Sequence, residues 1–175
     1  MRANGARTLT RIAIMVALAT ALHVVEAMIP IPYVVPGAKL GLANIVALYA
    51  VMTMTPGEAL AISFLRTLLG SLLSGTFLNV AYYLSTSGAL ASTAVMCGFK
   101  KVFGHGLSVV GISVAGAVTH NVTQLFVASI ILRQMGVMFY LPYLLLFAIP
   151  TGIFVGILAG RIIVYTETLS KKYRG

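Results

Sequence analysis

Residues 107–132 read LSVVGISVAGAVTHNVTQLFVASIIL, a segment that carries no formal charge. A helix rises about 1.5 Å per residue, so roughly 20 apolar residues suffice to cross a bilayer. The segment exceeds that length, and we expect it to span. Its centre nevertheless holds large polar side chains, which are costly against lipid and normally face a bundle interior or a water-filled cavity. These side chains are Thr119, His120, Asn121, Thr123 and Gln124.

The spacing of this polar centre allows its side chains to act together. Side chains three and four positions apart lie on one face of a helix, so His120, Asn121 and Gln124 can converge. Two interpretations are open. The groups bind a ligand, or they form interhelical hydrogen bonds that hold a bundle together, at roughly 0.6 to 2 kcal/mol per contact. We favour a binding site, because several large hydrogen-bonding groups exceed what cohesion requires.

The composition places the whole chain in a membrane. Of its 175 residues, 59% are hydrophobic and 9% are charged, whereas a soluble domain has about 25% charged residues. Apolar segments run almost end to end, which predicts a single transmembrane domain over residues 1–175 without a soluble catalytic lobe. The net charge of +9 does not indicate a nucleic-acid partner, because the basic residues gather at the chain ends and in one loop. The single cysteine, Cys97, has no metal-site spacing, and we expect no cofactor.

Six segments are predicted to cross the membrane, so the expected fold class is all-α. They cover residues 11–29, 41–54, 59–73, 77–99, 107–132 and 138–164. Polar and glycine residues at 85–88 predict a weak point or break in the fourth segment, and Pro142 and Pro150 predict kinks in the last. Residues 30–40, PIPYVVPGAKL, contain three prolines and a glycine and predict an ordered loop or lid.

The distribution of basic residues predicts that both termini are cytoplasmic. With residues 1–10 and 165–175 as basic inner flanks, only Lys39 and Arg133 lie outside, which satisfies the positive-inside rule. A five-span arrangement, with residues 41–73 crossing once, would place the basic tail outside, and we reject it. The expected inner cations are Arg2, Arg7, Arg11, Lys100, Lys101, Arg161, Lys171, Lys172 and Arg174.

In this orientation the polar side chains of the spans gather in the outer half of the membrane. The pattern predicts a pocket that is open to the outside and closed toward the cytoplasm. Its cationic groups suit a carboxylate or phosphate, while Tyr82, Tyr83 and Phe126 offer flat apolar surface to a ring or prenyl chain. The predicted substrate-binding residues are Glu26, Lys39, Asn44, Arg66, Asn79, Tyr83, His120, Asn121 and Gln124.

Structural roles remain open for several of these residues. Arg66 lies about midway along its span, where a charge must face protein, water or a partner, and it can instead pair with Glu26 or cap backbone carbonyls. Lys39 can serve as an interfacial anchor. Asn44 and Asn79 can serve as helix caps or bundle contacts.

The first span also carries a strip of small residues. Ala13, Ala17 and Ala21 recur every four positions, which makes a flat face where another helix can approach closely. This spacing predicts a docking face.

Three motifs together resemble a bacterial family, the Gx transporters, often labelled heptaprenyl diphosphate synthase component I. They are PGAKLGLANIVALYA at 36–50, RTLLGSLLSGTFLN at 66–79 and GAVTHNVTQLFVA at 116–128, and the resemblance covers almost the whole chain. That family is similar to the S components of energy-coupling factor (ECF) transporters, six-helix proteins that bind vitamins or their precursors from outside. The resemblance implies a multi-pass protein of the bacterial cytoplasmic membrane, among membrane lipids. It also implies that the alanine strip docks onto a transmembrane coupling subunit driven by two ATPase subunits, and that residues 30–40 form a lid.

The synthase label is at odds with the sequence. Prenyl diphosphate synthases hold Mg²⁺ and diphosphate with clustered aspartates, whereas this chain has no aspartate, and its glutamates, Glu26, Glu58 and Glu167, are dispersed. No GxxxxGK[ST] motif occurs either, so any ATP must be used by partners. We therefore expect that the chain is not an enzyme.

Three functions remain open. The first is a substrate-binding subunit that captures a vitamin-, flavin- or isoprenoid-like small molecule from outside. The second is a non-catalytic membrane adaptor of an isoprenoid, quinone or flavin-linked electron-transfer system, contacting a soluble enzyme through the basic tail. The third is a proton-coupled carrier working alone, which no visible inverted repeat supports.

Overall fold

The computed structural model describes residues 2–28 and 41–172. Their regular elements are all helical, as the sequence predicts. Two short 3-10 helices connect longer ones: η1 (Gly104–Gly106) and η2 (Met135–Tyr140). The α-helices of the described residues are α1 (Arg2–Met28), α2 (Leu42–Thr53), α3 (Pro56–Leu73), α4 (Val80–Phe103), α5 (Val109–Leu132) and α6 (Leu141–Lys172).

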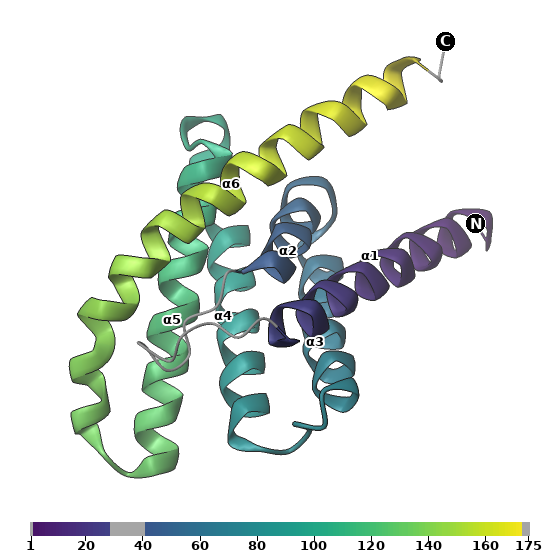
Figure 1. Ribbon diagram of the computed structural model, residues 1–175. Helices are drawn as coiled ribbons and strands as arrows, with labels where there is room; N and C mark the ends of the chain where they lie inside the picture. The colour runs from purple at the N-terminus through teal and green to yellow at the C-terminus, as the bar shows by residue number, and fades with distance from the viewer. Residues whose placement is uncertain (1, 29–40, 173–175) are drawn as a thin grey trace.

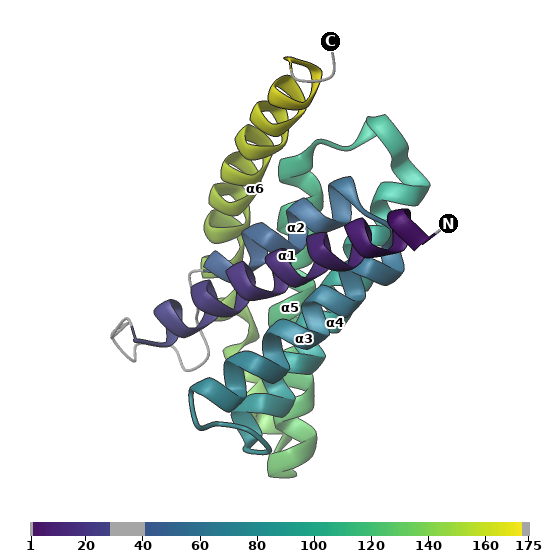
Figure 2. The same cartoon turned by 90° about the vertical axis from the view of Figure 1, so that its right-hand side faces the viewer.

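The six helices pack in a closed ring. Going round it, α1 contacts α3, α3 contacts α4, and α4, α5 and α6 follow in order, after which α2 links α6 back to α1. Figures 1 and 2 show α3, α4, α5 and the first part of α6 running side by side, with α1 lying across α2 and α3. Helix α2 also touches α3 and α4, and half of its 12 residues are buried. The short helix therefore closes the ring and also packs inward against α3 and α4.

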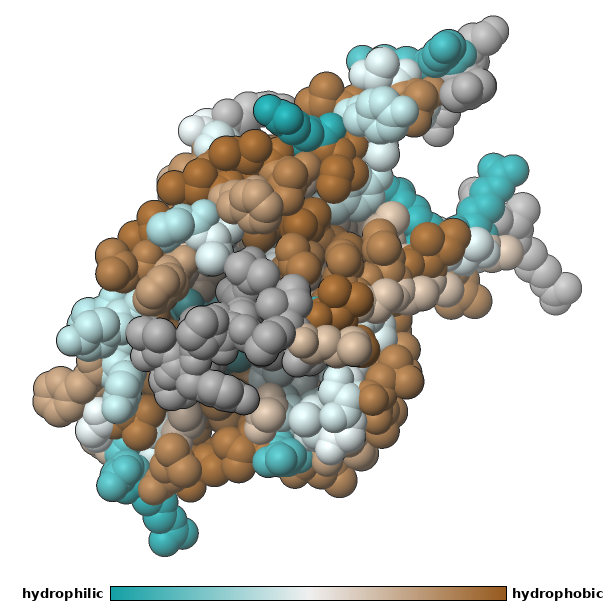
Figure 3. Space-filling model, viewed as in Figure 1, coloured by the Kyte–Doolittle hydropathy of each residue, from teal (hydrophilic) through white to brown (hydrophobic). Residues whose placement is uncertain are grey.

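The surface and interior of the bundle have the polarity of a membrane protein. Large apolar side chains such as Leu18, Phe126 and Phe154 are exposed, and brown hydrophobic residues cover much of the face in Figure 3. The interior instead holds hydroxyl groups, including Ser63 and Thr93, which share a 2.7 Å hydrogen bond. Three stretches, Gly5–Glu26, Val109–Leu132 and Met135–Lys172, are long and apolar enough to cross a membrane. The chain is a multi-pass membrane protein, and six crossings remain a prediction.

The predicted break at residues 85–88 is wrong, because α4 is continuous from Val80 to Phe103. Its small residues serve packing instead. A Cβ on Gly88 would lie 2.9 Å from Cγ of Gln124 and 3.1 Å from His120, so the glycine lets α5 approach closely. Ser87 donates to the carbonyl of Leu84 at 3.1 Å within the helix. Contact with α5 therefore outweighs the weak helix propensity of this stretch.

The two prolines of the last helix differ in role. Pro142 lies in the first turn of α6, where a missing N–H costs nothing, so it begins the helix and the kink predicted there is wrong. Pro150 lies inside α6, and the helix changes direction along its course in Figure 1. An interior proline removes one backbone hydrogen bond, which permits such a bend.

Close to one end of the bundle, Lys100 fixes the end of α2. The sequence placed Lys100 in a loop, but α4 extends to Phe103. The Lys100 ammonium donates to the carbonyls of Val51 at 2.8 Å and Met52 at 3.1 Å. A cation at a helix C-terminus satisfies carbonyls that lack intrahelical partners and complements the helix dipole.

The apolar core lies toward this same end. It gathers the second half of α2 and the facing turns of the other helices, and it includes Val51, Ala59, Ile62, Ile112 and Ala159. These side chains are almost completely buried. The core thus fills the end of the ring at which α2 ends.

Candidate functional site

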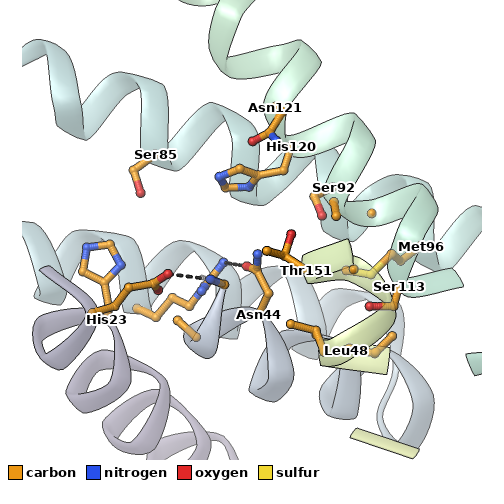
Figure 4. Close-up of a pocket in the computed structure, with 18 residues that line it drawn as sticks. His23, Asn44, Leu48, Ser85, Ser92, Met96, Ser113, His120, Asn121 and Thr151 are labelled. Carbon is orange, nitrogen blue, oxygen red and sulfur yellow. Dashed lines mark hydrogen bonds between the residues drawn. The ribbon is translucent and has the colours of Figure 1, made fainter. Parts of the chain in front are cut away.

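A polar cavity of about 50 Å³ lies beside the core, between all six helices. Its floor is formed by core residues Leu48, Met96 and Val155. Figure 4 shows polar side chains from different helices pointing into the space between them. The principal polar lining residues are His23 and Glu26 of α1, Asn44 of α2, Arg66 of α3, and His120 and Asn121 of α5.

Arg66 is the buried cation of this cavity. Only 3% of its surface is exposed. Its Nη2 atom donates to Oδ1 of Asn44 at 2.8 Å (Figure 4), and its buried Nε atom has no hydrogen-bond partner within the described part of the chain. A guanidinium carries five N–H donors, and buried donors are normally satisfied. Arg66 therefore has unused hydrogen-bonding capacity inside the protein.

Glu26 is the acid that faces the same cavity, with 6% of its surface exposed. Its Oε1 atom accepts a hydrogen bond from the backbone N–H of Gly41. Gly41 has a φ of +77°, a left-handed conformation that glycine adopts without strain, and it precedes the first residue of α2. Glu26 thus joins the end of α1 to the start of α2. It acts on Arg66 electrostatically, but no ion pair joins these two described residues.

The polar centre of α5 divides between two roles. His120 and Asn121 line the cavity, and Nδ2 of Asn121 donates to the carbonyl of Leu144 in α6 at 3.2 Å. Gln124 is buried against Gly88, between α4 and α5, and is not among the lining residues described. The structure therefore places two of these three predicted residues at the cavity and the third in a helix contact.

Two other predicted residues, Asn79 and Tyr83, are not among the lining residues described. Asn79 precedes α4 and caps it, since its Oδ1 atom accepts from the Val80 N–H at 2.6 Å. Tyr83 is exposed and makes an edge contact with Tyr82. Lys39 falls outside the described residues. The structure thus brings together Glu26, Asn44, Arg66, His120 and Asn121.

Several lining residues were not selected from the sequence. His23, which lies near the end of α1, is at the cavity in Figure 4. Ser85, Ser92 and Ser113 also line it. The seven-residue spacing of the first two indicates a common face, but serines are too frequent in membrane helices for this signal to stand alone.

The alanine strip lies on the outside of the bundle. Ala13, Ala17 and Ala21 are all exposed on α1. The opposite face of α1 packs inward through buried Val16 and Ala19. The strip is therefore free to contact another helix.

Comparisons with known proteins agree with this architecture. The solved S component of a bacterial ECF transporter superposes with a TM-score of 0.56, covering 93% of this chain and 97% of that one at 18% identity, which shows a shared fold. A comparison with curated protein sequences gave no significant match. The family model for heptaprenyl diphosphate synthase component I matches residues 15–162, most of the chain. This chain therefore belongs to the heptaprenyl diphosphate synthase component I family.

Proposed function

We propose that this chain is the substrate-binding membrane subunit of an ECF-type uptake transporter. It captures a vitamin-, flavin- or isoprenoid-like small molecule from outside the cell. The observation that carries the proposal is the cavity at Arg66, where polar groups from six helices converge. The likeness in fold to an S component supports it.

The proposed orientation has six crossings and cytoplasmic termini. In support, cations such as Lys100, Lys101 and Arg161 lie on the segments next to the apolar core. Their concentration on one side fits the positive-inside rule. The cavity lies on the other side of that core, so a ligand enters from outside.

The cavity is too small to hold a whole vitamin-sized ligand. Pockets for drug-sized ligands are about 300 to 1,000 Å³, whereas this one is about 50 Å³. A vitamin-sized molecule therefore needs the surrounding helices to separate. The small volume corresponds to a closed state in which one functional group is accommodated.

In this proposal, release to the cytoplasm depends on partner subunits. The exposed strip of Ala13, Ala17 and Ala21 allows a helix of a transmembrane coupling subunit to approach α1 closely. The partner ATPases supply the energy. Because α1 also carries Glu26 and His23 into the cavity, movement of α1 changes the site directly.

Two experiments test this function. Purified wild-type chain should gain thermal stability from its ligand, and Arg66→Ala and Asn121→Ala should lose that gain. Ala17→Leu should abolish co-purification with coupling and ATPase subunits but keep the ligand response. Ala94→Leu, which enlarges an exposed alanine on α4, is the matched control and should keep both.

An adaptor role is the second candidate, favoured by the family description and by the C-terminal end of α6. This part of α6 projects from the bundle in Figure 1 and carries exposed Tyr165 and Lys171. An adaptor would bind a soluble partner through this end. Partner binding that needs Lys171 and Lys172, in a chain that no small molecule stabilises, would replace capture by the adaptor role.

A further inference from the structure

Among the described residues, the guanidinium of Arg66 forms no ion pair, although the charge of Glu26 acts on it from a distance. Its hydrogen bond goes to the neutral amide of Asn44, and its buried Nε donor has no partner among the described residues. A buried charge is costly unless it is paired and hydrogen-bonded. Arginine also offers two parallel N–H donors to a carboxylate, which is its most favourable partner geometry. The Nε donor of Arg66, which is closed off from solvent in this closed state, is thus suited to an anion once the helices separate.

Glu26 does not take this place. Its carboxylate accepts from the N–H of Gly41, and among the described residues no ion pair connects it to Arg66. Its negative charge instead limits the charge of any ligand beside it. The described residues that line the cavity contribute one formal cation, Arg66, and one formal anion, Glu26. A carboxylate adds one negative charge to this lining, whereas a doubly charged phosphate adds two, and the larger uncompensated charge costs more to bury.

Three serine hydroxyls provide further ligand contacts. Some buried hydroxyls of this chain donate to a carbonyl one turn back, as those of Ser71 and Ser129 do. Ser85, Ser92 and Ser113 line the cavity and, among the described residues, have no such bond. Figure 4 shows these three serines around the space that also holds Asn44 and His120. Their hydroxyls remain available to the polar part of a ligand.

We propose that the captured molecule is a monocarboxylic acid whose carboxylate accepts a hydrogen bond from the unpartnered Nε donor of Arg66. This inference rests on the proposed capture function and narrows its substrate class. A carboxylate group is small enough for a cavity of about 50 Å³. When the surrounding helices separate to admit the whole molecule, the remainder of the acid extends toward the serine hydroxyls of α4 and α5.

Acetate and acetamide test the inference, because they share a shape and differ in charge. Thermal unfolding of the purified chain is followed in detergent at fixed pH and ionic strength, with chloride as the reference salt. Acetate should raise the unfolding midpoint, whereas acetamide and inorganic phosphate should not. Nicotinate and nicotinamide provide a larger acid and amide pair, with the acid expected to bind about 10- to 100-fold more tightly, as expected for charge-assisted hydrogen bonds.

Two variants assign the effect to Arg66. Arg66→Gln removes the charge, and Asn44→Asp puts a carboxylate at the existing 2.8 Å contact, so both should abolish the acetate response. Asn44→Asp changes the shape of the side chain little, so it tests the role of Arg66 even if Arg66→Gln does not fold. Arg161→Gln, at an exposed arginine of α6, is the control and should respond like wild type.

The outcomes separate this inference from the capture function. Equal stabilisation by acetate and acetamide, or an acetate response that survives in both site variants, overturns the acid assignment. If a neutral molecule stabilises the wild type and loses its effect in Asn121→Ala, capture stands and the acid assignment fails. If no small molecule stabilises the chain, both fail.

Discussion

Replacing Gly156 of α6 with alanine tests the close packing of α5 on α6. A Cβ at this position would lie 2.7 Å from the Cα of Val110 and 3.0 Å from Cβ of Ser113. Real Cβ atoms do not approach backbone so closely, so α5 and α6 must move apart. Gly160 lies one turn further on, and a Cβ there meets nothing within 4 Å. The two glycines therefore form a matched pair on one helix.

The expected magnitude follows from two opposing terms. Alanine stabilises a helix interior by about 1 kcal/mol relative to glycine, and this gain applies equally to both positions. Overpacking costs about 1 to 3 kcal/mol and applies only to Gly156→Ala. We therefore expect Gly156→Ala to be less stable than Gly160→Ala by about 1 to 3 kcal/mol.

The measurement is equilibrium unfolding of both variants in the same detergent, with the wild type alongside. Gly160→Ala should equal or exceed the wild type in stability. Since Ser113 lines the cavity, Gly156→Ala should also weaken ligand stabilisation. If the two variants have equal stability, the α5 to α6 contact described here is incorrect.

Two further predictions concern the end of the bundle near the core. Lys100→Met keeps the apolar stem but loses both hydrogen bonds to α2, so it should destabilise the chain by about 1 to 2 kcal/mol. Lys101 is exposed, so Lys101→Met should have little effect. Equal losses of stability in the two variants would contradict the contact between Lys100 and α2. The pKa of Glu58, before the predicted span 59–73, is lowered chiefly by the Thr55 backbone N–H and then by the Thr55 hydroxyl. The stabilisation of the folded state by ionised Glu58 is therefore complete above the ordinary glutamate pKa of about 4.3. It is lost as pH falls through the lowered folded-state pKa. Unfolding midpoints between about pH 3 and 5 should fall more steeply for wild type than for Glu58→Gln, and parallel curves would refute this role.

The helical fold could be predicted because membrane-spanning segments are recognised by their length and their lack of charge. The same local reasoning identified Arg66, His120 and Asn121, since polar groups inside apolar segments must face protein or water. These three residues line the cavity. The alanine strip on α1 was visible for a similar reason, because its spacing is a property of one helix.

Features that depend on contacts between helices could not be predicted in this way. Gly88 indicates a helix break when read alone, but it makes room for Gln124 and His120 of α5. Gln124 shares a face with His120 by spacing, yet the approach of α4 places it outside the cavity lining. Asn79 precedes α4 as its cap, and a single sequence does not distinguish this role from ligand binding.

The packed floor beneath the cavity has a consequence for the energy balance of the cell. Ile62 and Ile112 of the core expose only 0% and 1% of their surfaces to solvent. Hydrated ions cannot pass such a plug, because shedding water against hydrocarbon is prohibitively costly. Many copies of this chain should therefore be able to lie in a membrane without letting hydrated sodium ions leak down their gradient.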